Sequence, residues 1–209
     1  MMYYLLATLT GYFLGSIPTG FLVARRLGVD IRAQGSGNIG ATNVFRILGW
    51  KCGVFVLLMD GLKGFLGCRS ALLFANASGA DVTWLLIIGG FASVLGHNYT
   101  PWLRFRGGKG IATSAGVLIA LTPYGFLGAL IAFLVALGIS RMVSLGSIMS
   151  GVFLPLVVWW RGEPLPVLGI CVLMGAMAVF KHRSNISRMI AGTEPKIGQK
   201  KTKEEEEEV

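Results

Sequence analysis

The segment Gln34–Arg46, QGSGNIGATNVFR, is the polar stretch from which the mostly apolar chain is best interpreted. Its three glycines permit positive φ angles, so that successive backbone N–H groups can turn toward one anion. Small polar side chains that add hydrogen-bonding groups are Ser36, Asn38, Thr42 and Asn43. The guanidinium of Arg46 matches the oxygens of a phosphate. If ATNVFRIL begins a helix, the positive end of that helix adds to the site. The pattern predicts an anion-binding loop, and the alternative is a glycine-rich connector between two helices.

The composition indicates a protein whose solvent is a lipid bilayer. Of the 209 residues, 54% are hydrophobic and 14% are charged, and the mean hydropathy is +0.67. A soluble domain carries roughly 25% charged residues, so these charges are too few to cover a soluble globule. Thirty glycines and eight methionines suit closely packed membrane helices. We therefore expect an all-α polytopic membrane protein.

Basic residues outnumber acidic ones, which gives a net charge of +9. They lie between apolar runs, as the positive-inside rule predicts, and they do not alternate with aromatic residues, so we expect no nucleic-acid partner. The cysteines Cys52, Cys68 and Cys171 lie in or beside apolar runs and are expected to be small buried hydrophobes. No Cys/His cluster has the spacing of a metal site. The opening MMYYLLATLT has no basic region or cleavage site and predicts a retained span.

Hydropathy predicts about seven transmembrane helices, with the N-terminus outside and the C-terminus in the cytoplasm. The apolar runs are Tyr3–Ala24, Gly53–Phe74, Val82–Gly96, Ile111–Leu121, Tyr124–Ile139, Val143–Trp160 and Leu165–Phe180. In this topology only Arg69 and Arg161 face outward, while Lys63 lies within a run. If the two runs beside Pro123 formed one bent helix, the alternation would fail. Residues 1–198 are expected to form the membrane domain, and 199–209 a charged, disordered tail without a catalytic part.

Two interruptions of the pattern need separate interpretation. Leu27–Lys51 is expected to be a polar, glycine-rich loop. Asp60 and Lys63 interrupt the second apolar run at i, i+3 spacing and would face the same way on a helix. A mutually neutralising pair is the favoured interpretation, and a functional role of an ionisable residue within a span is the alternative. The NAS triplet at 76–78 matches a glycosylation sequon, which is too short a motif to carry weight.

A second polar segment, GHNYTPWLRFRGGKGIAT, covers residues 96–113 and lies on the same side as the first. Lys109 stands among Gly107, Gly108 and Gly110, which predicts a second anion-binding loop. The segment is not a nucleotide-binding P-loop, because that motif needs Ser or Thr directly after the lysine and a strand before the loop.

The third polar segment, Lys181–Lys196, reads KHRSNISRMIAGTEPK. His182, Asn185 and Arg188 are spaced three residues apart and would share one face of a helix. A basic helix that binds anionic lipid head groups is the alternative. Carboxylates are scarce around all three polar segments. The expected site therefore binds multiply charged anions and stabilises negative charge that develops in a transition state.

Together the three segments resemble a known family. GSGNIGATNVFR (35–46), GHNYTPWLRFRGGKGIAT (96–113) and HRSNISRMIAGTEPK (182–196) strongly resemble the three cytoplasmic motifs of the bacterial acyl-phosphate:glycerol-3-phosphate acyltransferases, the PlsY type. DGLKG at 60–64 is similar to the second helix of that family. The resemblance covers about residues 1–197. Two departures are Arg106, where the family usually has lysine, and the acidic tail.

The resemblance implies transfer of a fatty acyl group from acyl phosphate to the 1-hydroxyl of glycerol 3-phosphate. The products would be lysophosphatidic acid and phosphate, in the first acylation step of bacterial phospholipid synthesis. It also implies no cofactor and no metal, contact with membrane lipid, no obligatory protein partner, and an active site on the cytoplasmic side of the bacterial inner membrane.

Residue roles follow from the same resemblance. Catalytic roles would belong to Ser36, Arg46, Lys109, His182 and Asn185. Phosphate binding would belong to Gly35, Gly37, Asn38, Gly40, Thr42, Asn43, Gly107, Gly108, Gly110 and Ser144. Glu194 would pair with a basic residue and hold the third segment in place. No residue is expected to act as a strong general base, so the substrate phosphate would take the proton.

Two rival functions remain open from the residues alone. A transporter of small organic phosphates would also use broken helices and glycine-rich loops that point at anions. A structural or lipid-binding membrane protein would explain the spans but not the two glycine-rich loops. Phosphate release from acyl phosphate that depends on glycerol 3-phosphate would separate an enzyme from both.

Overall fold

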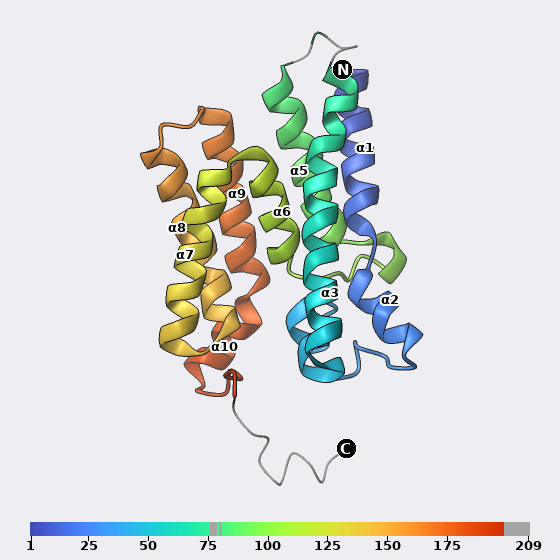
Figure 1. Ribbon diagram of the computed structural model, residues 1–209, viewed down its shortest axis with the longest axis vertical. Coiled ribbons are helices and arrows are strands. Elements are labelled where there is room, and N and C mark those ends of the chain that lie inside the picture. Colours follow the sequence, from blue (N-terminus) through green and yellow to red (C-terminus); the bar gives the residue numbers. More distant parts are fainter. Residues whose placement is uncertain (76–78, 80, 199–209) are drawn as a thin grey trace.

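Helices make up the regular secondary structure of the computed structural model in the residues that it describes, 1–75, 79 and 81–198 (Figure 1). The first part of the chain forms α1 (Met2–Ser16), α2 (Thr19–Arg26), α3 (Ala41–Arg69), η1 (Ser70–Phe74) and α5 (Val82–Asn98). The second part forms η2 (Pro101–Leu103), α6 (Ile111–Leu121), α7 (Pro123–Ser140), α8 (Val143–Trp160), α9 (Leu165–Lys181) and α10 (Arg183–Ile190). The NAS triplet at 76–78 and the acidic tail predicted at 199–209 lie outside the described residues.

The long helices form two groups that lie side by side. Figure 1 shows α1, α3 and α5 on one side of the molecule and α7, α8 and α9 on the other. Helix α6 lies between the groups and packs against α3, α5, α7 and α9. The short helices α2 and α10 lie at the end of the bundle opposite the N-terminus. This end therefore gathers polar segments that are far apart in the sequence.

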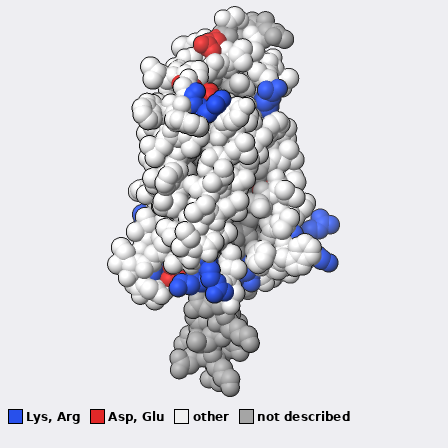
Figure 2. Space-filling model, turned by 60° about the vertical axis from the view of Figure 1, so that its left-hand side comes forward, with Lys and Arg blue, Asp and Glu red and all other residues white. Residues whose placement is uncertain are grey.

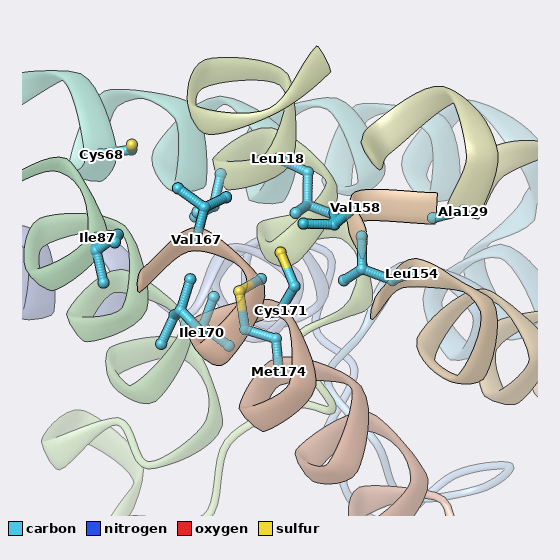
Figure 3. Packing of buried hydrophobic residues seen from close by; sticks show 12 residues of the cluster. Cys68, Ile87, Leu118, Ala129, Leu154, Val158, Val167, Ile170, Cys171 and Met174 are labelled. Atoms are coloured by element: carbon cyan, nitrogen blue, oxygen red, sulfur yellow. The ribbon is translucent and has the colours of Figure 1, made fainter. Parts of the chain in front are cut away.

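Apolar side chains from six helices fill the centre of the bundle (Figure 3). The central cluster contains Cys68, Ile87, Val94, Val117, Leu118, Ala129, Leu154, Val158, Val167, Ile170, Cys171 and Met174. Cys68 and Cys171 are fully buried free thiols, which confirms their interpretation as small hydrophobes. Cys52 is also a free thiol and is only partly buried.

The surface between the two ends of the bundle is apolar as well. Figure 2 shows Lys, Arg, Asp and Glu near the ends of the molecule, with a broad band of other residues between them. Leu58 and Ile131, for example, are 65% and 62% exposed. An apolar surface of this extent would be unfavourable in water, and it indicates contact with lipid.

Several helices are long and apolar enough to cross a membrane. By length and composition these are Met2–Arg26, Val82–Leu103, Pro123–Ser140 and Val143–Trp160, four in the described part of the chain. Leu165–Lys181 and Arg183–Ile190, which are bent by 53° relative to each other, make a fifth if they count as one span. Helix α3, which carries Asp60 and Lys63, and the 11-residue α6 do not meet this criterion. The structure thus supports an integral membrane bundle, and the count of seven stays a prediction.

The first apolar run is broken into two helices at Ile17 and Pro18. Proline has no N–H and clashes with the preceding turn, so α1 ends at Ser16 and α2 begins at Thr19. Other segments satisfy the carbonyl groups at the break. Lys63 Nζ donates to the Ile17 carbonyl at 2.7 Å, and Thr100 Oγ1 donates to the Ser16 carbonyl at 2.6 Å. The run still counts as one candidate span, Met2–Arg26, so the prediction of one span agrees with the structure, with a break at Pro18 inside it.

The predicted loop Leu27–Lys51 is wrong in its second half. Helix α3 already begins at Ala41, as the alternative for ATNVFRIL expected, and it is interrupted at Gly49, whose φ of 84° and ψ of 175° are not helical. Glycine adopts this conformation without strain. An added Cβ at Gly53 would clash with Phe45, which shows that the short segment before Gly49 folds back closely on the helix that follows.

The two runs beside Pro123 are separate helices. Helix α6 ends at Leu121 and α7 begins at Pro123, and the Thr122 side chain accepts a hydrogen bond from the Gly125 N–H. The two helices pack against each other and run in opposite directions in Figure 1. The alternative of one bent helix is therefore excluded.

Close helix crossings at glycine generate a stability prediction. Gly15 of α1 approaches α5 so closely that an added Cβ would clash with the Ser93 carbonyl group, whereas a Cβ at Gly138 of α7 would meet nothing within 4 Å. We expect Gly15→Ala to lower the unfolding free energy by about 1–3 kcal/mol through overpacking. Thermal unfolding of the protein in detergent measures this effect. Gly138→Ala is the matched control and should leave the midpoint unchanged or raise it. Equal effects of the two substitutions would contradict the close crossing.

Candidate active site

A polar pocket of about 210 Å³ brings the three polar segments together. Its lining residues are Ser36, Asn38, Gly107, Gly108, Lys109, Lys181, Arg183, Ser184 and Arg188. The lining contains four cationic side chains and no carboxylate. A pocket with this charge binds anions. Asn38 of the first segment and Lys109 of the second therefore line one shared pocket.

The first polar loop is held in shape by Asn43. This residue is 2% exposed, and its side chain accepts a hydrogen bond from the Ser36 N–H and donates to the Ile31 and Gln34 carbonyls. Gly37 donates to the Gln34 carbonyl as well. Because these N–H groups bind within the loop, the loop presents the side chains of Ser36 and Asn38 to the pocket. This differs from the row of free N–H groups that the glycine pattern predicts.

The second polar loop is anchored to the end of α5. The Gly107 N–H donates to the Asn98 carbonyl at 3.2 Å, and the Gly108 N–H donates to the His97 carbonyl at 3.1 Å. A Cβ at Gly108 would clash with the His97 ring. The glycines therefore allow close packing. Lys109 follows them, and α6 begins two residues later, so that the unsatisfied N–H groups of its first turn face the same end of the molecule.

The third polar segment changes direction at His182. This residue lies between α9 and α10, where the chain bends by 53°, and it is 3% exposed. Its Nδ1 lies 2.8 Å from the Ala178 carbonyl oxygen, which only accepts, so Nδ1 carries a proton. The bend directs the first residues of α10, Arg183 and Ser184, into the polar pocket.

Four side chains form a hydrogen-bonded chain that joins the second and third segments. Lys109 Nζ donates to Asn185 Oδ1, and Asn185 Nδ2 donates to Glu194 Oε1 at 2.7 Å. Arg188 Nε donates to Glu194 Oε2 at 2.8 Å. Lysine can only donate and an ionised carboxylate can only accept, so the Asn185 amide has one orientation. The predicted ion pair of Glu194 with a basic residue is thus present.

Burial and neighbouring charges shift the pKa values of Lys109 and Glu194 in this hydrogen-bonded series. Burial lowers the pKa of Lys109 to about 8, and the nearby guanidinium of Arg188 and ammonium of Lys181 act in the same direction, while Glu194 opposes them. For Glu194 burial acts upward, but the surrounding side chains of Ser144, Asn185 and Arg188 lower its pKa below the ordinary value. Glu194 is therefore ionised, and Lys109 is a cation that loses its charge more readily than a surface lysine.

An apolar pocket of about 510 Å³ lies beside the polar one, between α3, α6, α7, α8 and α9. Two segments border both pockets. Lys109 lines the polar pocket, and Ile111 and Ala112 line the apolar one. On α9, Lys181 lines the polar pocket, and Ala178, one turn earlier, lines the apolar one. A ligand with an anionic head and a hydrocarbon tail can therefore occupy both pockets at once.

Not every predicted site residue lines the polar pocket. Thr42 and Arg46 are exposed on the first turns of α3, and Asn43 is buried support. His182, Asn185 and Glu194 lie behind the pocket wall. The remaining predicted residues that do not line it are Gly35, Gly37, Gly40, Gly110 and Ser144.

The pocket is also lined by Lys181, Arg183 and Ser184, which lie in the third polar segment but were not predicted as site residues. Only their placement at the bend between α9 and α10 shows that they line the pocket. In the described part of the chain, no group of three or more His, Cys, Asp or Glu side chains is arranged to hold a metal ion.

Comparisons with known proteins give one consistent result. The family model described as glycerol-3-phosphate acyltransferase matches residues 5–192. A glycerol-3-phosphate acyltransferase of Rippkaea orientalis is 44% identical over 208 residues, which cover 96% of this chain and 96% of that protein. One of Trichlorobacter lovleyi is 45% identical over 186 residues, covering 89% of this chain and 93% of that protein.

Solved structures agree with these relatives. The glycerol 3-phosphate form of PlsY, an integral membrane glycerol 3-phosphate acyltransferase, is similar with a TM-score of 0.85 and 40% identity, over 93% of this chain and 96% of that chain. The lysophosphatidic acid form of PlsY has a TM-score of 0.83 at the same identity, over 93% of this chain and 95% of that chain.

The low pKa of Lys109 predicts pH-dependent anion binding. Sulfate is a suitable probe, because its charge does not change in this range. Protonated Lys109 attracts the anion, and the proton is lost as the pH rises through about 8, so sulfate affinity measured by calorimetry should fall between about pH 7 and 9. Lys109→Arg keeps its charge and should flatten this dependence. An equal fall in the Lys109→Arg variant would assign the titration to another group.

Glu194 is predicted to stabilise the third segment. Glu194→Gln leaves Asn185 and Arg188 with a neutral partner, and we expect a loss of about 1–2 kcal/mol in unfolding free energy, reduced by the partial exposure of Arg188. Because its pKa is lowered on folding, the contribution of Glu194 is present above its unfolded pKa and is lost as the pH falls through its folded pKa. Glu163→Gln is the control, since Glu163 accepts a neutral hydrogen bond from Thr122 and forms no ion pair with any residue that the structure describes. The measurement is unfolding in denaturant. Equal losses of unfolding free energy in the two variants would contradict the prediction.

Proposed function

The chain belongs to the glycerol-3-phosphate acyltransferase family, and we propose that it transfers a fatty acyl group from acyl phosphate to the 1-hydroxyl of glycerol 3-phosphate. The products are lysophosphatidic acid and inorganic phosphate. It is an acyltransferase of phospholipid synthesis, and the acyl phosphate donor and the position of the acylated hydroxyl are the parts that we propose.

The adjacency of the two pockets is the observation that carries this proposal. Acyl phosphate has a hydrocarbon chain joined to a phosphate through one carbonyl carbon. With the chain in the apolar pocket and the phosphate in the polar pocket, that carbon lies where Lys109 and Ile111 separate the two. Glycerol 3-phosphate has no apolar part, so it needs only the polar pocket. A single cationic pocket next to an apolar one therefore suits this pair of substrates.

The cations of the polar pocket have to hold two phosphates. Lys109, Lys181, Arg183 and Arg188 all line it. Hydrogen bonds to charged groups are stronger than neutral ones, and they also stabilise charge that develops during the reaction. Ser36 and Asn38 add neutral hydrogen-bonding groups to the same lining. We propose that these side chains place the hydroxyl of one substrate against the carbonyl carbon of the other.

The bond changes need little from the protein. The 1-hydroxyl oxygen forms a bond to the acyl carbon, the bond between that carbon and the phosphate oxygen breaks, and phosphate leaves with the electron pair. The hydroxyl proton passes to a phosphate oxygen of the donor. Among the described groups, Glu194 is held by Asn185 and Arg188, and neither Glu194 nor His182 lines the polar pocket, so we propose that the donor phosphate itself takes the proton.

The roles of some predicted site residues and the membrane topology also belong to the proposal. Arg46, Ser144 and His182 do not line the polar pocket, and their catalytic or phosphate-binding roles would require contacts made when substrate binds. We propose seven membrane crossings, with the N-terminus outside and the polar pocket on the cytoplasmic side of the inner membrane. The distribution of Lys and Arg supports this orientation, since the polar pocket lies at the end of the bundle that is richer in them.

A direct assay tests the function. Purified protein in detergent, given a long-chain acyl phosphate, should release phosphate only when glycerol 3-phosphate is present, and lysophosphatidic acid should form in equal amount. Acyl-CoA should not replace the donor. Phosphate release that does not depend on glycerol 3-phosphate would overturn the proposal.

A matched pair of lysine variants tests the site. Lys109→Ala removes a buried cation of the pocket and should lower kcat/KM about 100-fold or more. Lys51→Ala removes an exposed lysine that lies over the Trp50 ring, outside the pocket, and should keep the wild-type rate. Full activity of the Lys109→Ala enzyme with both substrates would contradict the assignment.

A further inference from the structure

Asp60 and Lys63 form an ion pair inside the bundle that the acyl transfer described above does not use. Lys63 Nζ lies 2.8 Å from Asp60 Oδ1, and the two side chains are 6% and 2% exposed. The sequence prediction of a neutralising pair is confirmed. However, burying two charges costs several kcal/mol for each ion, and their attraction rarely offsets more than that cost. Stability alone therefore does not explain why such a pair is present inside the bundle, and a functional role is the alternative.

Each member of the pair contacts a second element. Lys63 Nζ donates to the Ile17 carbonyl oxygen at 2.7 Å, where α1 breaks into α2. Asp60 Oδ1 lies 3.8 Å from His97 Nδ1 on α5, and His97 is 4% exposed. Ser93, one turn before His97, donates through its hydroxyl to the Lys63 carbonyl at 3.2 Å. The pair thus connects α3 with the break of the first run and with the end of α5.

His97 also contacts the second polar loop. Its ring is packed so closely on Gly108 that an added Cβ there would clash with it. Its backbone carbonyl accepts the Gly108 N–H, and the neighbouring Asn98 carbonyl accepts the Gly107 N–H. The imidazole therefore lies between the Asp60 carboxylate and the loop that carries Lys109.

The start of the same loop is tied to the same break. Thr100 Oγ1 donates to the Ser16 carbonyl at 2.6 Å, and Trp102 Nε1 donates to the Ser16 hydroxyl at 3.0 Å. Lys63 binds the very next carbonyl, that of Ile17. One break in the first run therefore serves as an anchor for both the ion pair and the loop.

We propose that Asp60, Lys63 and His97 are positioning residues. They hold the Gly107–Lys109 loop in the position from which Lys109 donates its hydrogen bond to Asn185. None of the three lines the polar pocket, so they act on the reaction through the loop. The activity readout of this proposal rests on the proposed acyl transfer, whereas its structural readout does not.

The decisive variant removes both charges together. Asp60→Leu combined with Lys63→Met introduces apolar side chains of similar length and leaves no unpaired charge, a kind of replacement that folds often tolerate, although the Ile17 carbonyl loses its Lys63 donor. We expect a folded protein whose thermal midpoint falls only by the loss of the hydrogen bond to the Ile17 carbonyl, a fall of about tenfold or more in kcat/KM, and faster amide exchange of the peptide that contains Gly107 and Gly108. Peptides of α7 and α8, which lie in the other helix group, should exchange as in the wild type.

A second variant tests the proposal without touching the ion pair. His97→Ala should reproduce the faster loop exchange and the loss of kcat/KM, and His97→Gln, which keeps a polar group of similar reach, should recover part of both. If the double variant fails to fold, these two His97 variants test the proposal on their own. Asp30→Asn is the control, because its ion pair with Arg32 is exposed and should matter little.

The outcomes separate positioning from stability and from function. Wild-type kcat/KM in the double variant would overturn the proposal. So would loss of activity with slow, wild-type exchange at Gly107 and Gly108, since the effect would then not pass through the loop. If the wild-type enzyme itself failed to use acyl phosphate, the proposed function would fall, while the exchange measurements would still test the positioning.

Discussion

The hydrogen bond from the Lys109 ammonium to the Asn185 side chain is the interaction on which the rest of the site depends. It joins the loop before α6 to α10, two segments separated by three long helices in the sequence. Glu194 fixes the partner, because it accepts from Asn185 and Arg188 and so leaves the Asn185 oxygen facing Lys109. Burial lowers the pKa of Lys109, so the cation is held in a place where it is costly without an anion nearby. An anionic substrate relieves this cost and gains affinity from it.

The bilayer imposes the arrangement around that bond. A membrane bundle has to place polar groups where they are either paired internally or open to water at one end. Here α2 and α10, which follow the breaks at Pro18 and His182, lie together at one end of the bundle. The apolar pocket lies beside the polar one, and Lys109 lines the polar pocket while Ile111 lines the apolar one.

The structural role of the loop glycines could not be predicted from the sequence. The sequence predicted that the three polar segments belong together, because their composition differs so strongly from the apolar runs between them, and residues of all three line one cationic pocket. The expected use of glycine was different from the observed one. Gly107 and Gly108 allow close packing on His97, and Gly37 closes a turn inside its own loop. Both uses call for the same residue, since a missing Cβ serves close approach as well as positive φ. Only the positions of neighbouring segments distinguish them.

From the sequence alone, the membrane class, the helical runs, the Asp60–Lys63 pair and the resemblance of the three segments to one family could be determined, because hydropathy, i, i+3 spacing and motif order are local properties of a chain. The tertiary structure decided which side chains share a pocket. It placed Lys181 and Arg183 beside Ser36, set His97 between Asp60 and Gly108, and put an apolar pocket next to the cations. These relations join residues that are distant in sequence, and they arise from the packing of whole helices, which no local pattern encodes.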